Sequence, residues 1–496
     1  FGPIGVGQGK SDIALLLPVV MKAKVTVLLV PASLREKVLR LDYPTLVDQY
    51  RLPRLVGAKV LPLAAEGELH VLSYETFSSL KHARVLEELQ PDLIVCDEAH
   101  ALRHASAART KRFLAYFKEH RDCRLAVLSG TMTSRSIKDY AHLAWLALRE
   151  NAPIPTKWSV LEEWATAIDA APFRAPAGAL SRLCEDGEDA RDGFRRRLVE
   201  TEGVVATSES VLGTGLVLRE RPLKLGRATA EAVRKMRRTW TTPDQGEAFD
   251  DVLVLHRYLR QMAAGFYYRW VWPRNEPDVV RETWLDARRA WHREVANFLT
   301  YRAEAGIDSP LGYAKACADG KVRSKNYLLW QEVRDTARPE TEPVWLGDEL
   351  VDDAIAWARS EPGIVWVEHA ALGQRIAERS GLKHYGAGDD GILYEKGDRS
   401  VVASIRAHGT GKNLQRFSRN LVTTPPTSGS TWEQLLGRTH RSGQQADEVT
   451  FDVYRHTNEM SGAVTKAFTD AQYQFQTTGS PQKLLQATVM WQVTNG

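Results

Sequence analysis

The feature that most constrains the fold is the alternation of short apolar strands with helices in two separate parts of the chain. The clearest strand is the continuous apolar run at residues 25–30, which is typical of a buried parallel strand. The other strands expected in the first part are residues 69–74, 92–96 and 125–128. After Pro343 the pattern returns, with strands expected at residues 364–367, 401–405, 421–424 and 449–454. Strands that alternate with helices predict parallel sheets flanked by helices, and therefore an α/β fold.

The stretch between these two parts lacks strand patterns. Val233, Met236 and Trp240 recur there at helical spacing, which predicts a largely helical segment. A chain of 496 residues is also too long for one ordinary hydrophobic core. We therefore expect three units, namely a first lobe at residues 1–226, a mainly helical insertion at 227–342 and a second lobe at 343–496.

The composition is that of a globular protein, with 43% hydrophobic and 26% charged residues. No apolar run approaches the ~18 residues that a membrane span needs. The four cysteines lie far apart without a CxxC pair, which argues against a zinc site or a disulfide framework. We expect a cytoplasmic protein of a bacterial or phage-infected cell, with the nucleus as the alternative. Because the chain starts with Phe1 and not Met, we expect the natural protein to begin upstream.

Residues 5–11, GVGQGKS, form a glycine-rich loop directly before an expected helix. Such a loop turns its backbone N–H groups around phosphate oxygens, at a helix N-terminus that favours negative charge. The expected nucleotide-binding residues are Gly5, Gly7, Gln8, Gly9, Lys10 and Ser11. We expect Lys10 to reach the β- and γ-phosphates and the Ser11 hydroxyl to ligate Mg²⁺. The alternative is a plain glycine-rich turn before a helix.

Residues 93–98, LIVCDE, are an apolar strand that ends in two acidic residues. The carboxyl ends of parallel strands are where α/β sheets bind their ligands. We expect Asp97 to hold the Mg²⁺ ion, because carboxylate oxygens suit that ion. Glu98 is expected to orient or deprotonate an attacking water molecule. The alternative is a strand that ends in a solvated acidic turn.

Residues 434–444, QLLGRTHRSGQ, place two arginines three residues apart, and therefore on one helical face. Phosphoryl transfer needs a cation at the γ-phosphate as charge develops there, and arginine is always charged. We expect Arg438 and Arg441 to supply that cation, with Arg441 favoured. The alternative is an ordinary solvated basic face.

The glycine-loop lysine and the Asp-Glu-Ala-His at residues 97–100 together resemble the nucleotide site of superfamily 2 helicases with a DEAH box. The lettering of residues 434–444 is closest to the Swi/Snf-like branch, and the resemblance covers nearly the whole chain. It implies two RecA-like lobes with ATP and Mg²⁺ bound between them, and it adds Gln434 to the catalytic set. It also implies that four residues couple the ATP state to the grip on nucleic acid, namely His100, Ser129, Gly130 and Thr131.

Three further segments resemble helicase motifs that contact nucleic acid. They are residues 30–33 (VPAS), residues 73–77 (SYETF) and residues 404–414 (SIRAHGTGKNL). The resemblance implies that the nucleic-acid-binding residues are Ser33, Ser73, Tyr74, Gly409, Gly411, Lys412 and Asn413.

Tryptophan and arginine alternate at residues 267–272 and 288–293 of the expected insertion. Such residues stack on bases and neutralise phosphates in nucleic-acid-binding proteins. Tryptophan is equally suited to the core of a helical bundle. We favour core packing and keep nucleic-acid contact as the alternative.

These observations predict an ATP-dependent DNA helicase or translocase, a nucleic-acid-stimulated ATPase. The arginines of the second lobe are expected to complete the site when the cleft closes. The expected partner is DNA, with duplex favoured, and binding is expected to depend on salt because it uses the phosphate backbone. An RNA-acting superfamily 2 helicase and a non-enzymatic, nucleotide-gated scaffold are the alternatives. The net charge of +4 is compatible with a nucleic-acid partner.

Overall fold

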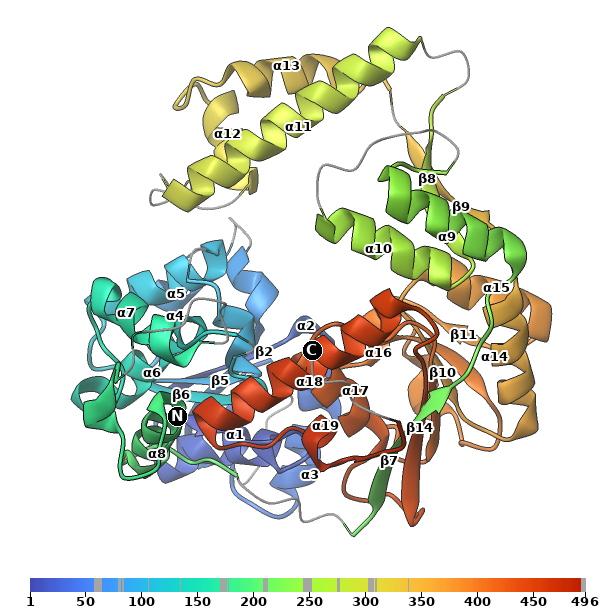
Figure 1. Cartoon of the computed structure of the whole chain (residues 1–496). Helices are drawn as coiled ribbons and strands as arrows, with labels where there is room; N and C mark the ends of the chain where they lie inside the picture. The colour runs from blue at the N-terminus through green and yellow to red at the C-terminus, as the bar shows by residue number, and fades with distance from the viewer. Residues whose placement is uncertain are drawn as a thin grey trace.

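The computed structural model confirms the α/β class, with two parallel sheets flanked by helices (Figure 1). It describes residues 1–57, 65–78, 82, 84–105, 107–133, 135–169, 176, 178–207, 213–243, 252–273, 277–301, 307, 310–337 and 339–491. Within that part of the chain, no helix has both the length and the apolar character required to cross a membrane.

The first sheet has six parallel strands in the order β1-β6-β5-β2-β4-β3. Their bounds are β1 Gly2–Pro3, β2 Val25–Val30, β3 Pro53–Leu55, β4 Ala65–Ser73, β5 Leu93–Asp97 and β6 Arg124–Ser129. Because the strands are parallel, the segments that follow β1, β5 and β6 meet at one edge of the sheet.

The residues of β2 explain why this sheet is covered on both faces. Val27 and Leu29 pack on one side, and Leu28 and Val30 pack on the other, as the two-residue period of a strand requires. The helices on the first side are α5 Ala108–Glu119, α6 Ala141–Leu148, α7 Trp158–Ile168 and α8 Ala190–Glu200, beside the short α4 Val85–Leu89. Those on the second side are α1 Lys10–Val20, α2 Ala32–Lys37 and α3 Tyr43–Val47, with a π-helical turn, η1, at Val38–Asp42. We call this sheet with its helices the first lobe.

The second sheet has seven parallel strands in the order β11-β12-β10-β13-β14-β7-β15. Their bounds are β7 Gly215–Arg221, β10 Ile364–Val367, β11 His384–Tyr385, β12 Val401–Ser404, β13 Arg419–Val422, β14 Glu448–Tyr454 and β15 Thr488–Val489. Its helices are α14 Glu349–Ser360, α15 Ala370–Ser380, α16 Ile405–His408, α17 Gly429–Thr439, α18 Asn458–Thr478 and α19 Lys483–Gln486. We call this sheet with its helices the second lobe.

Several boundaries differ from the sequence-based expectation, and two of them have a clear structural cause. Strand β7 pairs with β14 along its whole length, so the chain has entered the second sheet before residue 226, the expected end of the first lobe. This pairing joins residues more than 200 positions apart, which a local pattern does not reveal. Strand β12 ends at Ser404 because the Ser404 hydroxyl accepts a hydrogen bond from the Ala407 N–H and caps α16.

The insertion contains helices α9 Arg227–Thr239, α10 Val252–Ala263, α11 Asp278–Tyr301, α12 Pro310–Ala318 and α13 Lys325–Val333. It also contains two strands, β8 Phe266–Val271 and β9 Glu340–Trp345, which form an antiparallel pair. The expectation that strands vanish in this stretch is therefore wrong. The rings of Phe266 and Trp345 lie 4.9 Å apart, and this contact favours the ribbon over a helix. Figure 1 shows α11, α12 and α13 together at the top of the view, on the side of β8 and β9 that is away from the second sheet.

The tryptophans of the insertion mostly pack against one another and against arginines. The side chains of Trp284 and Trp291 are buried, and Trp291 stacks on Tyr313 with ring centroids 5.5 Å apart. The guanidinium of Arg288 lies over the rings of both Trp270 and Trp284. The favoured prediction of core packing is confirmed for Trp284 and Trp291, whereas Trp270 is half-buried.

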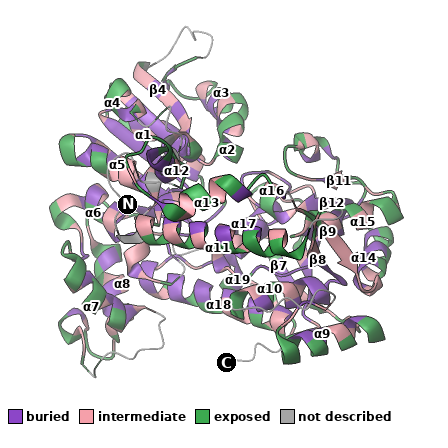
Figure 2. Ribbon diagram, turned by 90° about the horizontal axis from the view of Figure 1, so that it is seen from above, coloured by how far each residue is buried: buried purple, intermediate pink, exposed green. Residues whose placement is uncertain are grey.

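Helix α18 of the second lobe reaches across to the first lobe and packs against α8 (Figure 2). Its Gln474 side chain is fully buried and donates a hydrogen bond of 2.6 Å to the carbonyl of Gly130. The hydroxyl of Tyr473 donates to Asp169 at 2.9 Å. Helix α18 therefore fixes the first lobe at the turn that follows β6.

Candidate active site

The glycine-rich loop lies between β1 and the first turn of α1. Gly7 and Gly9 have φ angles of 86° and 77°, a left-handed conformation that favours glycine. A Cβ atom at Gly7 would lie 3.7 Å from the Cβ of Arg441, so this loop faces the second lobe directly. Gln8 stabilises the loop, because its Oε1 accepts a hydrogen bond from the Gly5 N–H at 3.0 Å.

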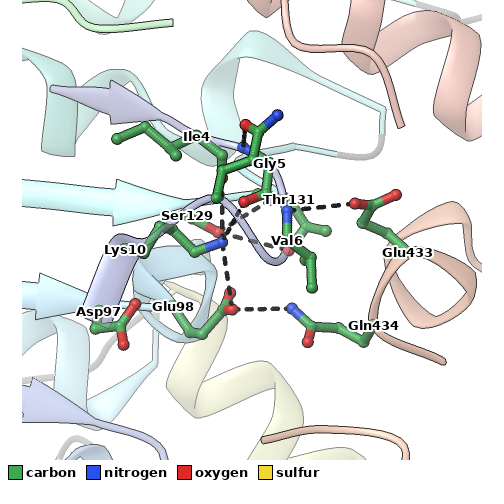
Figure 3. Close-up of polar contacts among 12 residues, drawn as sticks. Ile4, Gly5, Val6, Lys10, Asp97, Glu98, Ser129, Thr131, Glu433 and Gln434 are labelled. Atoms are coloured by element: carbon green, nitrogen blue, oxygen red, sulfur yellow. Dashed lines mark hydrogen bonds and ion pairs between the residues drawn. The ribbon is translucent and has the colours of Figure 1, made fainter. Parts of the chain in front are cut away.

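Lys10 begins α1 and points back into the loop (Figure 3). Its Nζ donates to the carbonyls of Ile4 and Gly5 at 3.1 and 3.0 Å, and it lies 3.9 Å from Oε1 of Glu98. The side chain is only 7% exposed. A buried ammonium group is therefore fixed between the glycine loop and the end of β5.

Asp97 and Glu98 lie at the end of β5, and both are buried. Burial and the neighbouring Glu98 raise the pKa of Asp97 to about 6. No donor among the described residues reaches the Oδ1 of Asp97. Burial also opposes ionisation of Glu98, but Lys10, His100 and Gln434 outweigh it and hold the Glu98 pKa below its ordinary value. Glu98 has a φ of 55°, which is uncommon for a residue with a side chain and typical of functional turns.

His100 joins Glu98 to the turn after β6. Its Nδ1 lies 3.3 Å from Oε2 of Glu98, 3.3 Å from the Ser129 hydroxyl and 3.1 Å from the Thr131 hydroxyl. The Thr131 N–H also donates to the Ser129 hydroxyl at 3.1 Å. The carbonyl of Gly130, in the same turn, accepts the bond from Gln474 described above. The predicted coupling residues therefore form one hydrogen-bonded group beside Glu98.

Helix α17 places side chains of the second lobe next to Glu98, at the end of β5. The Gln434 side-chain amide donates to Oε1 of Glu98 at 3.0 Å, as Figure 3 shows. Arg438 donates to the Gln434 side chain at 3.0 Å, to the Gln434 carbonyl at 2.7 Å and to the Lys412 carbonyl at 3.2 Å. Arg438 thus holds Gln434 and the 409–413 loop together, whereas Arg441 donates to the side chain of Asn413.

A cavity of ≈ 170 Å³ lies between these parts. The glycine loop, the end of β5, the 409–413 loop and α17 all contribute to its walls. Each of these segments was singled out from the sequence, and the fold brings them together from positions more than 400 residues apart.

Two of the predicted nucleic-acid-binding residues of the first lobe are not surface groups. Tyr74 is only 1% exposed, and its hydroxyl donates to the carbonyl of Asp97 at 2.8 Å. The expectation that Tyr74 contacts nucleic acid is therefore corrected, because its buried hydroxyl stabilises the end of β5 instead. Ser73 is also buried and lies 3.2 Å from the Thr76 hydroxyl. Ser33 is exposed, and its contact with nucleic acid stays a prediction.

The predicted nucleic-acid-binding loop of the second lobe faces inward. The Lys412 ammonium is buried between the carboxylate of Asp390 and the Nδ1 of His408. Gly409 and Gly411 are buried too, and a Cβ atom at Gly411 would clash with Leu34 of the first lobe. Asn413 binds Arg441 and lines the cavity. We therefore correct the role of this loop, which lies between the lobes and borders the cavity.

The sequence analysis missed several charged residues of this region. Glu433 is buried next to Gln434, and its Oε1 accepts a hydrogen bond of 3.4 Å from the Val6 N–H of the glycine loop (Figure 3). Lys37 and Asp42 line the cavity, as does Asp12. For Glu433, its position directly before Gln434 was an available signal. No sequence motif identifies Lys37 or Asp42.

No protein-family model matches the chain, and no curated protein matches it.

Proposed function

We propose that this chain is a nucleic-acid-stimulated ATPase motor, an ATP-dependent DNA helicase or translocase of the Swi/Snf-like branch of superfamily 2. In this proposal the two lobes are RecA-like and ATP binds between them. The observation that carries the proposal is the contact of Lys10, Glu98 and Gln434 across the lobe interface, at the wall of a cavity. A lysine, a carboxylate and a polar group from a second lobe are among the groups that enzymes use in nucleoside-triphosphate hydrolysis.

The residues present fit a magnesium nucleotide. The left-handed glycines and Lys10 suit polyphosphate oxygens, and the unpartnered Oδ1 of Asp97 suits a cation or its water ligands. Ser11 lines the same cavity and would be the second metal contact. When bound, Mg²⁺ would neutralise phosphate charge and keep most of its ligands as water and phosphate oxygens. This agrees with the lack of a three-residue His, Cys, Asp or Glu cluster in the described part of the chain.

The residues of the chain would act as follows. Glu98 stays ionised because Lys10, His100 and Gln434 stabilise its charge, so its carboxylate is ready to accept a hydrogen bond from the attacking water. Gln434 holds that carboxylate in place from the second lobe. Arg441 borders the cavity opposite Gly7 and would neutralise charge on the terminal phosphate. Arg438 acts as a positioning residue, since its donors already bind Gln434 and Lys412.

Coupling to a polymer would use the group formed by His100, Ser129 and Thr131. His100 connects Glu98 to the turn after β6, so a shift of the Glu98 side chain would be passed to that turn. The same turn contacts Gln474 of α18. Hydrolysis would therefore depend on the position of the lobes, as in other enzymes that close around a ligand. DNA is the proposed polymer, with duplex favoured, and its backbone would provide most of the contacts.

The test is steady-state ATP hydrolysis without polymer and with single-stranded DNA, duplex DNA or RNA. A Glu98→Gln variant serves as the control for contaminating ATPases. Stimulation mostly by duplex DNA, with an inactive control, is the expected result. Stimulation mostly by RNA would overturn the choice of polymer. Turnover that no polymer changes would overturn the motor and leave a nucleotide-gated scaffold.

A further inference from the structure

An ion pair that the proposed mechanism does not use lies in the wall of the same cavity. The Nζ of Lys37 is 2.7 and 2.8 Å from the two carboxylate oxygens of Asp42. The side chains are 21% and 13% exposed, and both residues line the cavity. The pair therefore faces the space in which a nucleotide would bind.

The π-helical turn is what brings the two residues together. Residues five apart point about 140° away from each other in a regular α-helix of 3.6 residues per turn. A π-helix repeats its hydrogen bonds at the fifth residue, so it places such residues on nearly the same side. Lys37 ends α2 and Asp42 ends the π-helical turn at Val38–Asp42. The local backbone thus builds this pair on the cavity side.

The pair lines the same cavity as the groups assigned to the metal and to the terminal phosphate. Burial raises the pKa of Asp97, and the charge of Lys37 is among the groups that lower it. Burial lowers the pKa of the Arg441 guanidinium, and the charge of Asp42 opposes that effect. Lys37 and Asp42 are therefore close enough to Asp97 and Arg441 to act on their charges.

The charges around the cavity are balanced. Its lining contains four basic residues, Lys10, Lys37, Arg438 and Arg441, and four acidic residues, Asp12, Asp42, Asp97 and Glu98. A polyphosphate would add negative charge to this space. A basic side chain stabilises the bound polyphosphate best if it can exchange its present carboxylate partner for a phosphate oxygen. Lys37 is such a side chain, because its partner is the carboxylate of Asp42, and both residues line the cavity.

We propose that Lys37 is a further phosphate-binding residue of this site, and that Asp42 is its counter-ion in the nucleotide-free protein and competes with the polyphosphate. The inference rests on the proposed function, because it assigns Lys37 to the same nucleotide. In this inference Lys37 strengthens nucleotide binding, whereas its ion-pair partner Asp42 weakens nucleotide binding. This opposition distinguishes the proposal from a purely structural ion pair.

The experiment measures the Kd of ATP and of ADP, each with Mg²⁺, by titration calorimetry on the full chain. The variants are Lys37→Gln and Asp42→Asn. The control is Glu36→Gln, which removes a charge from the neighbouring exposed residue that pairs with Arg35 and Arg40 outside the cavity. Circular dichroism checks that each variant is folded.

We expect Lys37→Gln to weaken ATP binding roughly tenfold, since it removes one charge-assisted contact. We expect Asp42→Asn to tighten ATP binding several-fold and the control to leave it unchanged. Equal weakening by both variants would show a structural ion pair and overturn the inference, as would no change in either. A wild-type chain that binds no nucleotide would instead overturn the proposed function, and the inference with it.

Discussion

The substitution Asp97→Asn is predicted to make the nucleotide-free protein more stable while it destroys the candidate metal site. Asp97 is 4% exposed, and its Oδ1 has no hydrogen-bond donor among the described residues. Its pKa rises from the ordinary 3.8 to about 6 because it is buried and lies beside Glu98. The fold therefore carries an ionised group at a position that disfavours ionisation, which is typical of a site prepared for a cation.

The size and sign of the effect follow from this pKa. One pKa unit corresponds to ~1.4 kcal/mol, so the rise from 3.8 to about 6 costs the folded state about 3 kcal/mol at pH values above 6. The cost falls as the pH drops through the folded pKa, because folded Asp97 then takes up a proton. It is about half as large near pH 5, and it disappears below the unfolded pKa of 3.8. Asparagine never ionises, so the variant avoids the cost throughout.

The assay is thermal unfolding without nucleotide at about pH 7.5 and about pH 5, for the wild type and for Asp97→Asn. A gain of about 3 kcal/mol corresponds to several degrees in Tm for a lobe of this size. The control is Asp286→Asn, which removes an equal charge from a side chain that is 76% exposed. Magnesium and ATP together are expected to raise the Tm of the wild type and not that of Asp97→Asn. A loss of stability at both pH values, or a gain that does not depend on pH, would refute the reasoning.

Three further predictions concern single side chains. Glu98→Gln is expected to retain ATP binding and to lower turnover by ~10²-fold or more, as single-turnover kinetics would measure; unchanged turnover would contradict the role of Glu98. Arg441→Ala is expected to lower turnover ~10³-fold with little change in Tm. Arg438→Ala should also lower the Tm, because it removes the donor to the buried Lys412 carbonyl and to the Gln434 side chain; equal Tm losses would contradict this division. Gln474→Leu leaves the buried carbonyl of Gly130 unpaired, so we expect an unfolding free energy lower by about 1–3 kcal/mol and weaker stimulation by DNA, and full stimulation would contradict the link through α18.

Local sequence patterns sufficed for the class of the fold and for several of the residues that line the candidate site. The apolar run at β2 and the acidic end of β5 are visible because a buried parallel strand must be continuously apolar, and its carboxyl end is where polar ligands bind. The glycine loop is visible because only glycine adopts the backbone of Gly7 and Gly9 without strain. These requirements act on a few neighbouring residues, so the sequence by itself determined them.

Only the tertiary structure decided which of these groups meet and which face the solvent. The sequence does not distinguish an exposed Tyr74 from one that supports Asp97, nor a Lys412 that binds a polymer from one that binds Asp390. It gives no sign that β7 belongs to the second sheet, or that a π-helical turn pairs Lys37 with Asp42. Burial, long-range strand pairing and the approach of the two lobes depend on residues distant in the chain, and the free energy of packing selects among arrangements that local patterns leave equivalent.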